Sequence, residues 1–474
     1  MNVSTKLHRL PHSLLAVCAA TLAGCSAPVP YGPVPTDAQL AWQRMETNMF
    51  CHFGPNTFTG AEWGSGDEGT EIFAPRALDC AQWVDVATEA GMGGIILTAK
   101  HHDGFCLWPS AFSTHTVADT LDVLRQFIDA CRDRVKAGVY ISPWDRNHPT
   151  YGTEEYNWVF AATLREVHEN YGPMFEQWFD GACGEGPNGK RQEYDWPTFE
   201  STVLHVNPQC VIFSDVGPGC RWVGNEEGRA GETCWSTLQV ESGKRKVESE
   251  ASEHGTPHST FHIPHSTLKW VPAECDVSIR PGWFWHPDEH PKTVDELMEI
   301  YYNSVGRNGL LLLNVPPDTN GRIAAEDSAV LVAFRAERNR IFSRDLAQGA
   351  KANAWHRWGC RAKNVLDTAY HTYWAACAKK DELTLTLDSA QEFDLIVIQE
   401  YIPLGQRVTR VDLLLDPGDG LYSYSLDQQP LCTTVGYKRI IRLDRPIRWQ
   451  KLVFRFEALA PPVINRIALY NSTK

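Results

Sequence analysis

Residues 100–105 read KHHDGF and place four titratable side chains directly after the apolar run GGIILTA. Polar or aromatic groups also follow three other apolar runs: MFCHF carries His52, GVYIS precedes Trp144 and Asp145, and MFEQWFD ends in Asp180. Short apolar runs of this kind predict buried strands. In a parallel barrel, functional groups gather where strands end and loops begin. We therefore expect these side chains to share one site.

Two carboxyl groups in this pattern could act together on a glycoside. Asp180 is followed by small residues, so its carboxylate could attack an electrophile or bind a metal; capping a loop is the alternative role. Trp178, one alternation earlier on the same strand face, could stack against a sugar. Glycoside chemistry needs a second, protonated carboxyl group. Glu226 and Glu227 in RWVGNEEGRAGE, residues 221–232, are candidates, although an acidic pair in a loop is usually only solvated.

The elements that would position these groups alternate in type from residue 39 to 343. Six runs predict buried strands: MFCHF, GGIILTA, VKAGVYIS, MFEQWFD, CVIFSD and LLLLNV. Stretches between them, such as AQWVDVATEAG and YNWVFAATLREVHENY, have helical spacing. This order predicts parallel strands with helical crossovers, and about 300 residues of it favour a (β/α)8-like TIM barrel in the α/β class. No G-x-G-x-x-G motif follows the first strand, which counts against a dinucleotide fold.

Residues 344–474 have a different pattern. ELTLTLD alternates with period two, and FDLIVIQEY, RVTRVDLLLD, KRIIRLD, KLVFRFE and INRIALY follow at short intervals. The pattern predicts an antiparallel β-sandwich. No exposed aromatic platform is obvious in this part of the sequence, so we expect it to pack on the barrel rather than to bind a ligand.

The amino terminus predicts export. Residues 1–24 have a basic start and the apolar stretch SLLAVCAATLAG, which is too short to span a bilayer, and LAGC resembles a bacterial lipoprotein cleavage box. Cleavage there would leave Cys25 as a lipidated first residue, with the Pro-rich residues 25–38 as a tether. An ordinary secretory signal is the alternative. We expect a lipid-anchored protein at the outer membrane, facing the periplasm or the outside.

Composition limits the classes of partner and cofactor. The formal net charge of −14 argues against nucleic acid, because phosphate binding requires a basic face. The 17 tryptophans include rings that could cover the apolar faces of sugars. Cysteines after Cys25 occur singly, with no C-x-x-C pair, which argues against a zinc ribbon or a redox motif. We expect no cofactor.

Six stretches resemble one known family: HFGPNTF, EWG, TAKHHDGFCLWPS, GVYISPWDRN, WFDGACGEGPNGK and RWVGNE. They are similar to bacterial α-L-fucosidases of glycoside hydrolase family 29, most of all to the branch acting on α-1,3- and α-1,4-linked fucose. The resemblance implies a (β/α) barrel, a galactose-binding or discoidin-like sandwich and a retaining double displacement. It also implies Asp180 as nucleophile and Glu226 as acid/base, with the adjacent Glu227 as the alternative.

The resemblance implies that the pocket binds fucose without a metal. The implied substrate-binding residues are His52, Glu62, Trp63, His101, His102 and Trp178, with Trp144, Arg221 and Trp283 as weaker candidates. Imidazoles suit sugar hydroxyls because each can donate and accept a hydrogen bond. A metal site is the competing interpretation, since His and carboxylate clusters also hold zinc. Adjacent histidines on a strand face opposite ways, however, so His101 and His102 could meet one ligand only in a loop.

The predicted function is hydrolysis of α-1,3/1,4-linked fucose from branched, Lewis-type oligosaccharides or glycoconjugates. One alternative is a broad α-L-fucosidase that also cleaves α-1,2 linkages and aryl fucosides. The other is a glycan-binding lipoprotein without turnover, against which the intact Asp180 and the GNEE loop count. The membrane is expected as a partner only through the lipid anchor, and the oligomeric state stays open.

Overall fold

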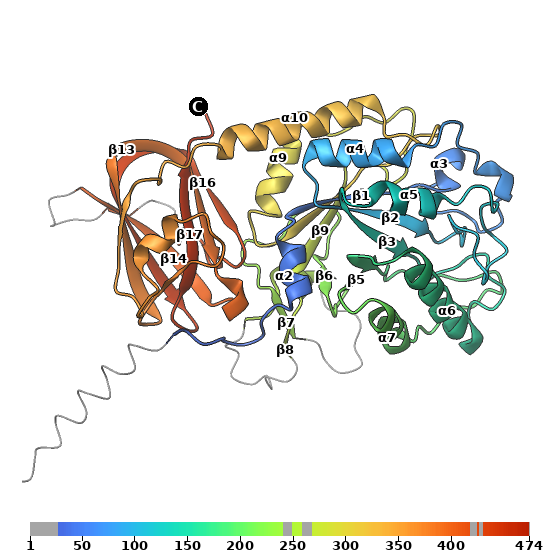
Figure 1. Ribbon diagram of the computed structural model, residues 1–474, viewed down its shortest axis with the longest axis horizontal. Helices are drawn as coiled ribbons and strands as arrows, with labels where there is room; N and C mark the ends of the chain where they lie inside the picture. The colour runs from blue at the N-terminus through green and yellow to red at the C-terminus, as the bar shows by residue number, and fades with distance from the viewer. Residues whose placement is uncertain (1–26, 240–248, 258–267, 418–423, 426–429, 474) are drawn as a thin grey trace, which may run out of the picture.

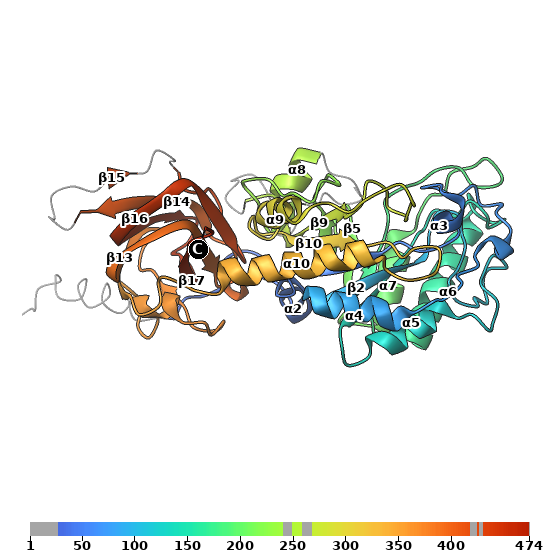
Figure 2. The same cartoon turned by 90° about the horizontal axis from the view of Figure 1, so that it is seen from above.

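The computed structural model describes residues 27–239, 249–257, 268–417, 424–425 and 430–473. Within these ranges, a closed parallel barrel is followed by an antiparallel β module (Figures 1 and 2). The barrel region extends from helix α2 (Asp37–Gln43) to helix α10 (Ala325–Phe342). The predicted fold class is confirmed.

Eight parallel strands close the barrel in the order β1-β10-β9-β6-β5-β4-β3-β2. They are β1 (Thr47–Cys51), β2 (Gly94–Lys100), β3 (Lys136–Ile141), β4 (Glu176–Trp178), β5 (Val211–Ser214), β6 (Cys220–Trp222), β9 (Ala273–Ser278) and β10 (Leu310–Asn314). Every residue of β1, β2 and β10 is buried, because the strands pack inward on the barrel interior and outward on helices. This double burial explains why the corresponding runs are continuously apolar.

Helices cover the outside of the barrel (Figure 1). They are α4 (Cys80–Ala90), α5 (Val123–Cys131), α6 (Glu154–Tyr171), α7 (Trp196–Val206), α9 (Val294–Asn303) and α10. Helix α4 shows how the sequence sets them: the Asp79 side chain accepts a hydrogen bond from Gln82 N at 3.0 Å and caps the first turn. Trp83 and Val84 are then fully buried. Shorter elements of this region are α3 (Asn56–Thr59), the 3-10 turn η1 (Thr70–Ile72), α8 (Ser249–His254) and the antiparallel pair β7 (Thr237–Gln239) and β8 (Leu268–Trp270).

Two barrel strands, β6 and β9, were not among the six predicted. Strand β6 overlaps the first two residues of the stretch 221–232, which the sequence suggests as a loop, and β9 reads AECDVS, with an acid at every second position early in the strand. Residues 215–219 join β5 directly to β6, without the helical crossover that the alternation predicts.

The carboxyl-terminal module is a seven-stranded antiparallel sheet. Its strands are β11 (Lys351–Asn353), β12 (Trp374–Ala375), β13 (Lys380–Glu400), β14 (Val408–Asp416), β15 (Tyr424–Ser425), β16 (Arg439–Ala458) and β17 (Val463–Tyr470), with 3-10 turns η3 (Ala362–Leu366) and η4 (Ile402–Leu404). The runs ELTLTLD and FDLIVIQEY form the single long strand β13, and KRIIRLD and KLVFRFE form β16. Register shifts between β13 and β16 mark irregular points in the ladder, and residues from both halves of each strand share one core.

The β module packs on the amino-terminal ends of the barrel strands. Glu46, just before β1, accepts a hydrogen bond from Tyr437 Oη at 3.2 Å, and Asn308, just before β10, accepts one from Tyr437 N at 2.7 Å. The described part of the predicted tether also contacts this module: Arg407 donates to Val29 O at 2.6 Å, and Tyr31 N donates to Leu404 O in η4.

The predicted signal peptide and Cys25 lie outside the described residues. Among the residues that the structure describes, no helix has the length and apolar character needed to cross a membrane. The described cysteines are all free thiols.

Candidate active site

A cavity of about 200 Å³ opens at the carboxyl-terminal end of the barrel strands. Its lining residues come from six strands and the segments after them: Phe50, His52, Glu62, Trp63, His101, His102, Tyr140, Trp178, Asp180, Ala182, Glu226, Asp276 and Trp283. The volume lies below the roughly 300–1,000 Å³ of sites for drug-sized ligands, so the cavity suits one small ring. The strand ends therefore converge as the sequence predicts.

Asp180 follows β4 and is held in place by two donors. Tyr140 Oη donates to Asp180 Oδ2 at 3.0 Å, and Ala182 N donates to Oδ1 at 2.7 Å. His102 Nε2 lies 3.7 Å from Oδ2. One quarter of the Asp180 side chain remains exposed, so a ligand can reach the carboxylate.

The two adjacent acids after β6 occupy different surroundings. Glu226 lines the cavity, and Trp283 Nε1 donates to its Oε2 at 3.3 Å. The side chain of Glu227 is 67% exposed and pairs with Arg229 instead. The cavity lining thus contains Glu226 together with Asp180, and it does not contain Glu227.

The stretch KHHDGF divides into structural and cavity-facing residues. Strand β2 ends at Lys100, whose ammonium group is buried and pairs with Asp145 at 3.0 Å. His101 and His102 follow in the loop, and both line the cavity with ring centroids 4.2 Å apart. The strand has given way to a loop at this point, which is the condition under which both rings could meet one ligand. Asp103 is buried, and its Oδ1 accepts from Phe105 N at 2.8 Å.

Hydrogen bonds fix the tautomers of two histidines. Asn314 Nδ2 donates to Ser278 Oγ and to the carbonyl of Trp283, so Asn314 Oδ1 accepts from His52 Nδ1 at 2.9 Å. Likewise, Ser142 Oγ donates to the carbonyl of Trp144, so it accepts from His102 Nδ1 at 2.8 Å. In both rings Nε2 then keeps its lone pair.

Burial keeps these imidazoles neutral. It lowers the pKa of His52 to about 3, although the hydrogen bond to Asn314 acts in the opposite direction. Burial also lowers the pKa of His101 well below its usual value and that of His102, where Asp180 counteracts it. His101 Nδ1 is buried without a partner in the described part of the chain. His52 and His102 can therefore accept hydrogen bonds from hydroxyl groups through Nε2.

Aromatic side chains form the remaining walls. Trp178 stacks on Phe213, with centroids 3.9 Å apart, and on Tyr140 at 5.3 Å. Trp63 is 60% exposed at the rim. Trp144 does not line the cavity; it is buried behind His102, with ring centroids 4.8 Å apart.

Glu62 connects the rim to the segment after β9. Its carboxylate accepts from Trp283 N and pairs with His286 Nε2, both at 2.8 Å. This contact holds the Trp283 segment over His52, with the two ring centroids 5.0 Å apart.

Arg221 does not reach the cavity, and its prediction as a sugar-contacting residue is wrong. The side chain is fully buried in β6, where Nε donates to Ser252 O at 2.8 Å and the other nitrogens reach Val271 O and Cys234 Sγ. The prediction failed because it placed Arg221 in a loop.

Sequence reasoning missed four residues of the lining, Phe50, Tyr140, Ala182 and Asp276. Asp276 is buried in β9, and its Oδ1 accepts from Trp222 Nε1 at 3.0 Å. Burial raises its pKa well above the usual range, and the charges of Glu226 and Asp180 raise it further. The alternation of acids in β9 was the available signal, because residues two apart on a strand share a face.

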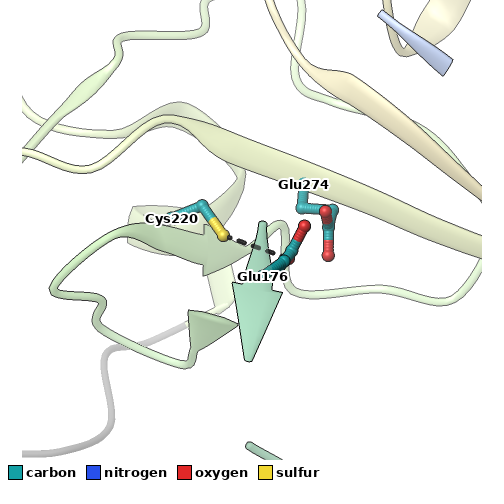
Figure 3. A group of neighbouring side chains, drawn as sticks. All are labelled: Glu176, Cys220 and Glu274. Carbon is teal, nitrogen blue, oxygen red and sulfur yellow. Dashed lines mark hydrogen bonds between the residues drawn. The ribbon is translucent and has the colours of Figure 1, made fainter. Parts of the chain in front are cut away.

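Beneath the cavity, Glu176, Cys220 and Glu274 converge inside the barrel (Figure 3). Glu274 Oε1 accepts from Trp178 Nε1 at 2.9 Å, and Glu176 Oε2 accepts from Trp42 Nε1 at 2.7 Å. Burial raises the pKa of Glu176 to about 7 and that of Glu274 well above its usual value.

The contacts of this cluster identify its chemistry. The possible ligand atoms lie within 4.8 Å of one another, a spacing that a metal ion could bridge. Two indole N–H groups already donate to these acids, one to each carboxyl group. Glu274 therefore braces Trp178 from below the cavity.

Comparison with known proteins identifies the family. The family model described as "Alpha-L-fucosidase" matches residues 34–335. Alpha-L-fucosidase 1 of Arabidopsis thaliana is 40% identical over 94% of this chain and 88% of its own length. A putative α-L-fucosidase structure from Bacteroides thetaiotaomicron has a TM-score of 0.85 and 36% identity, covering 94% of this chain and 99% of that one. A Ruminococcus gnavus family 29 fucosidase in complex with fucose has a TM-score of 0.85 and 30% identity, covering 95% of this chain and 97% of that one. The chain therefore belongs to the α-L-fucosidases of glycoside hydrolase family 29.

Proposed function

We propose that this chain is a retaining exo-α-L-fucosidase that removes α-1,3/1,4-linked fucose from branched, Lewis-type glycans. The observation that carries the proposal is the shared cavity of Asp180 and Glu226, which has room for one terminal ring and is lined by three neutral imidazoles. A terminal sugar fits such a site, whereas an internal sugar of a chain would need an open groove.

In the first step, an Asp180 oxygen attacks the anomeric carbon of fucose. The bond from that carbon to the glycosidic oxygen breaks, and Glu226 gives its proton to the departing oxygen. Asp180 is suited to this role because Tyr140 and Ala182 hold its carboxylate in place while part of it stays accessible. The product is a fucosyl ester of Asp180 and the free acceptor glycan.

In the second step, Glu226 acts as a base toward water. It removes a proton as the water oxygen attacks the anomeric carbon, and the ester bond to Asp180 breaks. Two displacements at one carbon return fucose with its original configuration. The Trp283 N–H beside Glu226 can orient the carboxyl group in both steps.

The histidines supply recognition rather than charge. His52 and His102 present unprotonated Nε2 atoms, which accept hydrogen bonds from sugar hydroxyls. Trp178, braced by Glu274, lines the cavity and contributes apolar surface beside the ring.

The catalytic pair is tested with aryl fucosides and matched variants. Asp180→Ala should abolish turnover, and Glu226→Gln should slow substrates with poor leaving groups far more than activated aryl fucosides. Glu227→Gln, one residue away but outside the cavity, is the control and should retain activity. If Glu227→Gln loses activity and Glu226→Gln does not, the acid/base assignment is wrong.

The linkage proposal is supported by the resemblance of WFDGACGEGPNGK and RWVGNE to the α-1,3/1,4-specific bacterial branch. Fucose release from a Lewis a trisaccharide, an α-1,2-fucosylated lactose and an aryl fucoside tests it. Release from the Lewis sugar alone supports the branch. Equal release from all three would keep the mechanism and overturn the linkage, and binding without release would favour the glycan-binding lipoprotein.

We also propose that the protein is exported by a bacterium and held at its outer membrane through a lipid on Cys25. The LAGC box and the Pro-rich segment after it support this proposal. Incorporation of labelled palmitate into the wild type but not into Cys25→Ala is the expected result. Labelling of both proteins would overturn it.

A further inference from the structure

The β module carries two unusually exposed tryptophans. Trp355 is 83% exposed and Trp358 is 81% exposed, the highest values among the large apolar side chains that the structure describes. Both lie in the loop between β11 and η3. A large apolar ring fully in water costs free energy, so such exposure often marks a contact surface. The sequence alone suggested no platform of this kind.

The loop that carries these rings is fixed to the sheet by its backbone. Trp374 Nε1 donates to Trp355 O at 2.8 Å, Arg357 N donates to Ala375 O at 2.9 Å, and Cys360 N closes a turn on Arg357 O at 3.0 Å. The ring of Trp355 is therefore presented by an ordered backbone, which lowers the entropic cost of binding a ligand.

Trp355 borders an open cavity of about 970 Å³ between the loop, β11, β13 and β16. Its charged lining residues are Lys380, Asp381, Glu382 and Arg455, whose formal charges cancel. The Lys380 ammonium is already paired with Glu457 at 2.8 Å, and Arg455 with Glu382 at 2.7 Å. The cavity thus offers polar groups without a net charge.

Uncommitted hydrogen-bonding groups lie beside the ring. Asn353 of β11 and Thr384 of β13 are opposite each other in the sheet, and both line the cavity. Neither side chain has a hydrogen-bond partner within the described ranges. An amide and a hydroxyl together can donate to and accept from a polyol.

From these features we propose that the Trp355 cavity is a second carbohydrate-binding site, for a neutral oligosaccharide. A flat indole face suits the apolar face of a pyranose, and the uncharged polar groups suit its hydroxyls. A membrane surface fits less well, since anionic lipid headgroups attract clusters of basic residues and this lining is neutral.

The place of the site in the fold determines its effect. The β module packs on the amino-terminal ends of the barrel strands, at Glu46 and Asn308, whereas the fucose cavity opens at their carboxyl-terminal ends. The second site therefore cannot extend the subsites around Asp180. It holds a multivalent glycoconjugate so that other branches of it reach the active site, which raises effective concentration.

The experiment uses the full chain with Asp180→Ala, so that binding is separated from turnover. This protein and its Trp355→Ala derivative are applied to an array of neutral oligosaccharides that lack fucose. We expect binding by the first protein and a loss of about tenfold or more on removal of the ring. Trp158→Ala is the matched control, because Trp158 is 67% exposed on barrel helix α6.

Activity of the otherwise wild-type enzyme gives a second readout. Trp355→Ala should leave kcat/KM for an aryl fucoside unchanged and should lower the rate on a multivalent fucosylated glycoprotein. Fucosidase activity of the parent protein is measured separately, so that failure of the proposed function is distinguished from failure of this site. If the Asp180→Ala protein binds no oligosaccharide on the array, or if binding persists after Trp355→Ala, the proposed binding site is overturned. Trp355-dependent binding of Cys25→Ala protein to lipid vesicles, without glycan binding, does so as well.

Discussion

At the scale of single residues, the candidate active site contains two donors that hold Asp180. Tyr140 Oη and Ala182 N each donate to one carboxylate oxygen, and His102 Nε2 stands 3.7 Å away. A carboxylate held by two fixed donors keeps one orientation toward a sugar ring bound in the cavity. That fixed orientation makes a short strand such as β4 sufficient to carry the proposed nucleophile.

Tyr140→Phe tests this arrangement by removing one oxygen atom. Hydrogen bonds to charged groups contribute about 1.5–3 kcal/mol, so kcat should fall about tenfold to a hundredfold for an aryl fucoside. Tyr301→Phe is the control, because Tyr301 Oη donates to Glu46 at the junction with the β module. It should lose stability and keep its kcat. Equal kcat values for both variants would contradict a positioning role for Tyr140.

The Glu176–Glu274 pair predicts a pH dependence of stability. Burial raises the folded-state pKa of Glu176 to about 7, above the value of an unfolded chain. A raised pKa stabilises the folded protein fully below the unfolded pKa, and this contribution is lost as the pH rises toward 7. Relative to Glu176→Gln, the wild type should lose about 1.4 kcal/mol of unfolding free energy per pH unit between pH 5 and 7. Denaturant titrations across this range measure it, and parallel curves for the two proteins would show that the pair holds no proton.

At the scale of elements, the loop after β2 is constrained by Gly104. Gly104 has φ +82, and a Cβ there would lie 2.3 Å from Oδ1 of Asp145, whose other carboxylate oxygen pairs with Lys100. Gly104→Ala should therefore displace the loop that carries His101 and His102. We expect a loss of more than about 1 kcal/mol of stability together with a rise in KM, measured by thermal unfolding and by steady-state kinetics.

Gly189→Ala is the matched control for Gly104→Ala. Gly189 has φ +72, but a Cβ there would meet no atom within 4 Å. The Gly189→Ala variant therefore has the backbone strain of a positive φ without a steric clash, and its loop does not line the cavity. If both variants raise KM equally, displacement of the histidine loop is not the cause.

The barrel strands show which elements a sequence can reveal. Strands β1, β2 and β10 are continuous apolar runs because both faces are packed, and the sequence predicts them. Strand β9 is buried at every position as well, yet Glu274, Asp276 and Ser278 face the interior, where each hydrogen-bonds to another element. A search for continuous apolar runs therefore misses β9, whose inward face carries polar side chains instead of apolar ones.

The same reasoning explains what could be predicted of the site. His52, His101 and Asp180 stand at the ends of apolar runs, where a change from apolar to polar residues marks the strand end. Asp276 lies inside a strand and has no such marker. The sequence predicts a loop at Arg221, and only the pairing of β6 with β5 and β9 shows that the residue lies in a buried strand.

At the scale of the whole molecule, the two parts are joined through Glu46. Its carboxylate pairs with the Lys438 ammonium and accepts hydrogen bonds from Tyr301 at 3.1 Å and Tyr437 at 3.2 Å. Helix α10 also runs along the barrel toward the β module (Figure 2). The junction therefore contains a partly buried charge that both parts satisfy together.

Glu46→Gln should weaken this junction in a pH-dependent way. Burial acts to raise the pKa of Glu46, but the Lys438 ammonium and the hydrogen bonds outweigh it, so the folded-state pKa is lowered. A lowered pKa stabilises the folded protein above the unfolded pKa, and that stability is lost as the pH falls through the folded value. The wild type should exceed Glu46→Gln by about 2 kcal/mol at pH 7, and the difference should shrink toward pH 3.5.

A second charge pair across the same junction is exposed, so it shows how much stability a charge pair contributes there without burial. Arg442 of β16 pairs with Glu299 of α9, and both side chains are about half exposed. Because solvent screens such a pair, Glu299→Gln should leave the denaturation midpoint nearly unchanged at pH 7. Activity on an aryl fucoside should survive in both variants, since the cavity opens at the opposite ends of the strands. If Glu299→Gln costs as much stability as Glu46→Gln, or if neither loss depends on pH, the junction is held by its apolar packing and not by the Glu46 carboxylate.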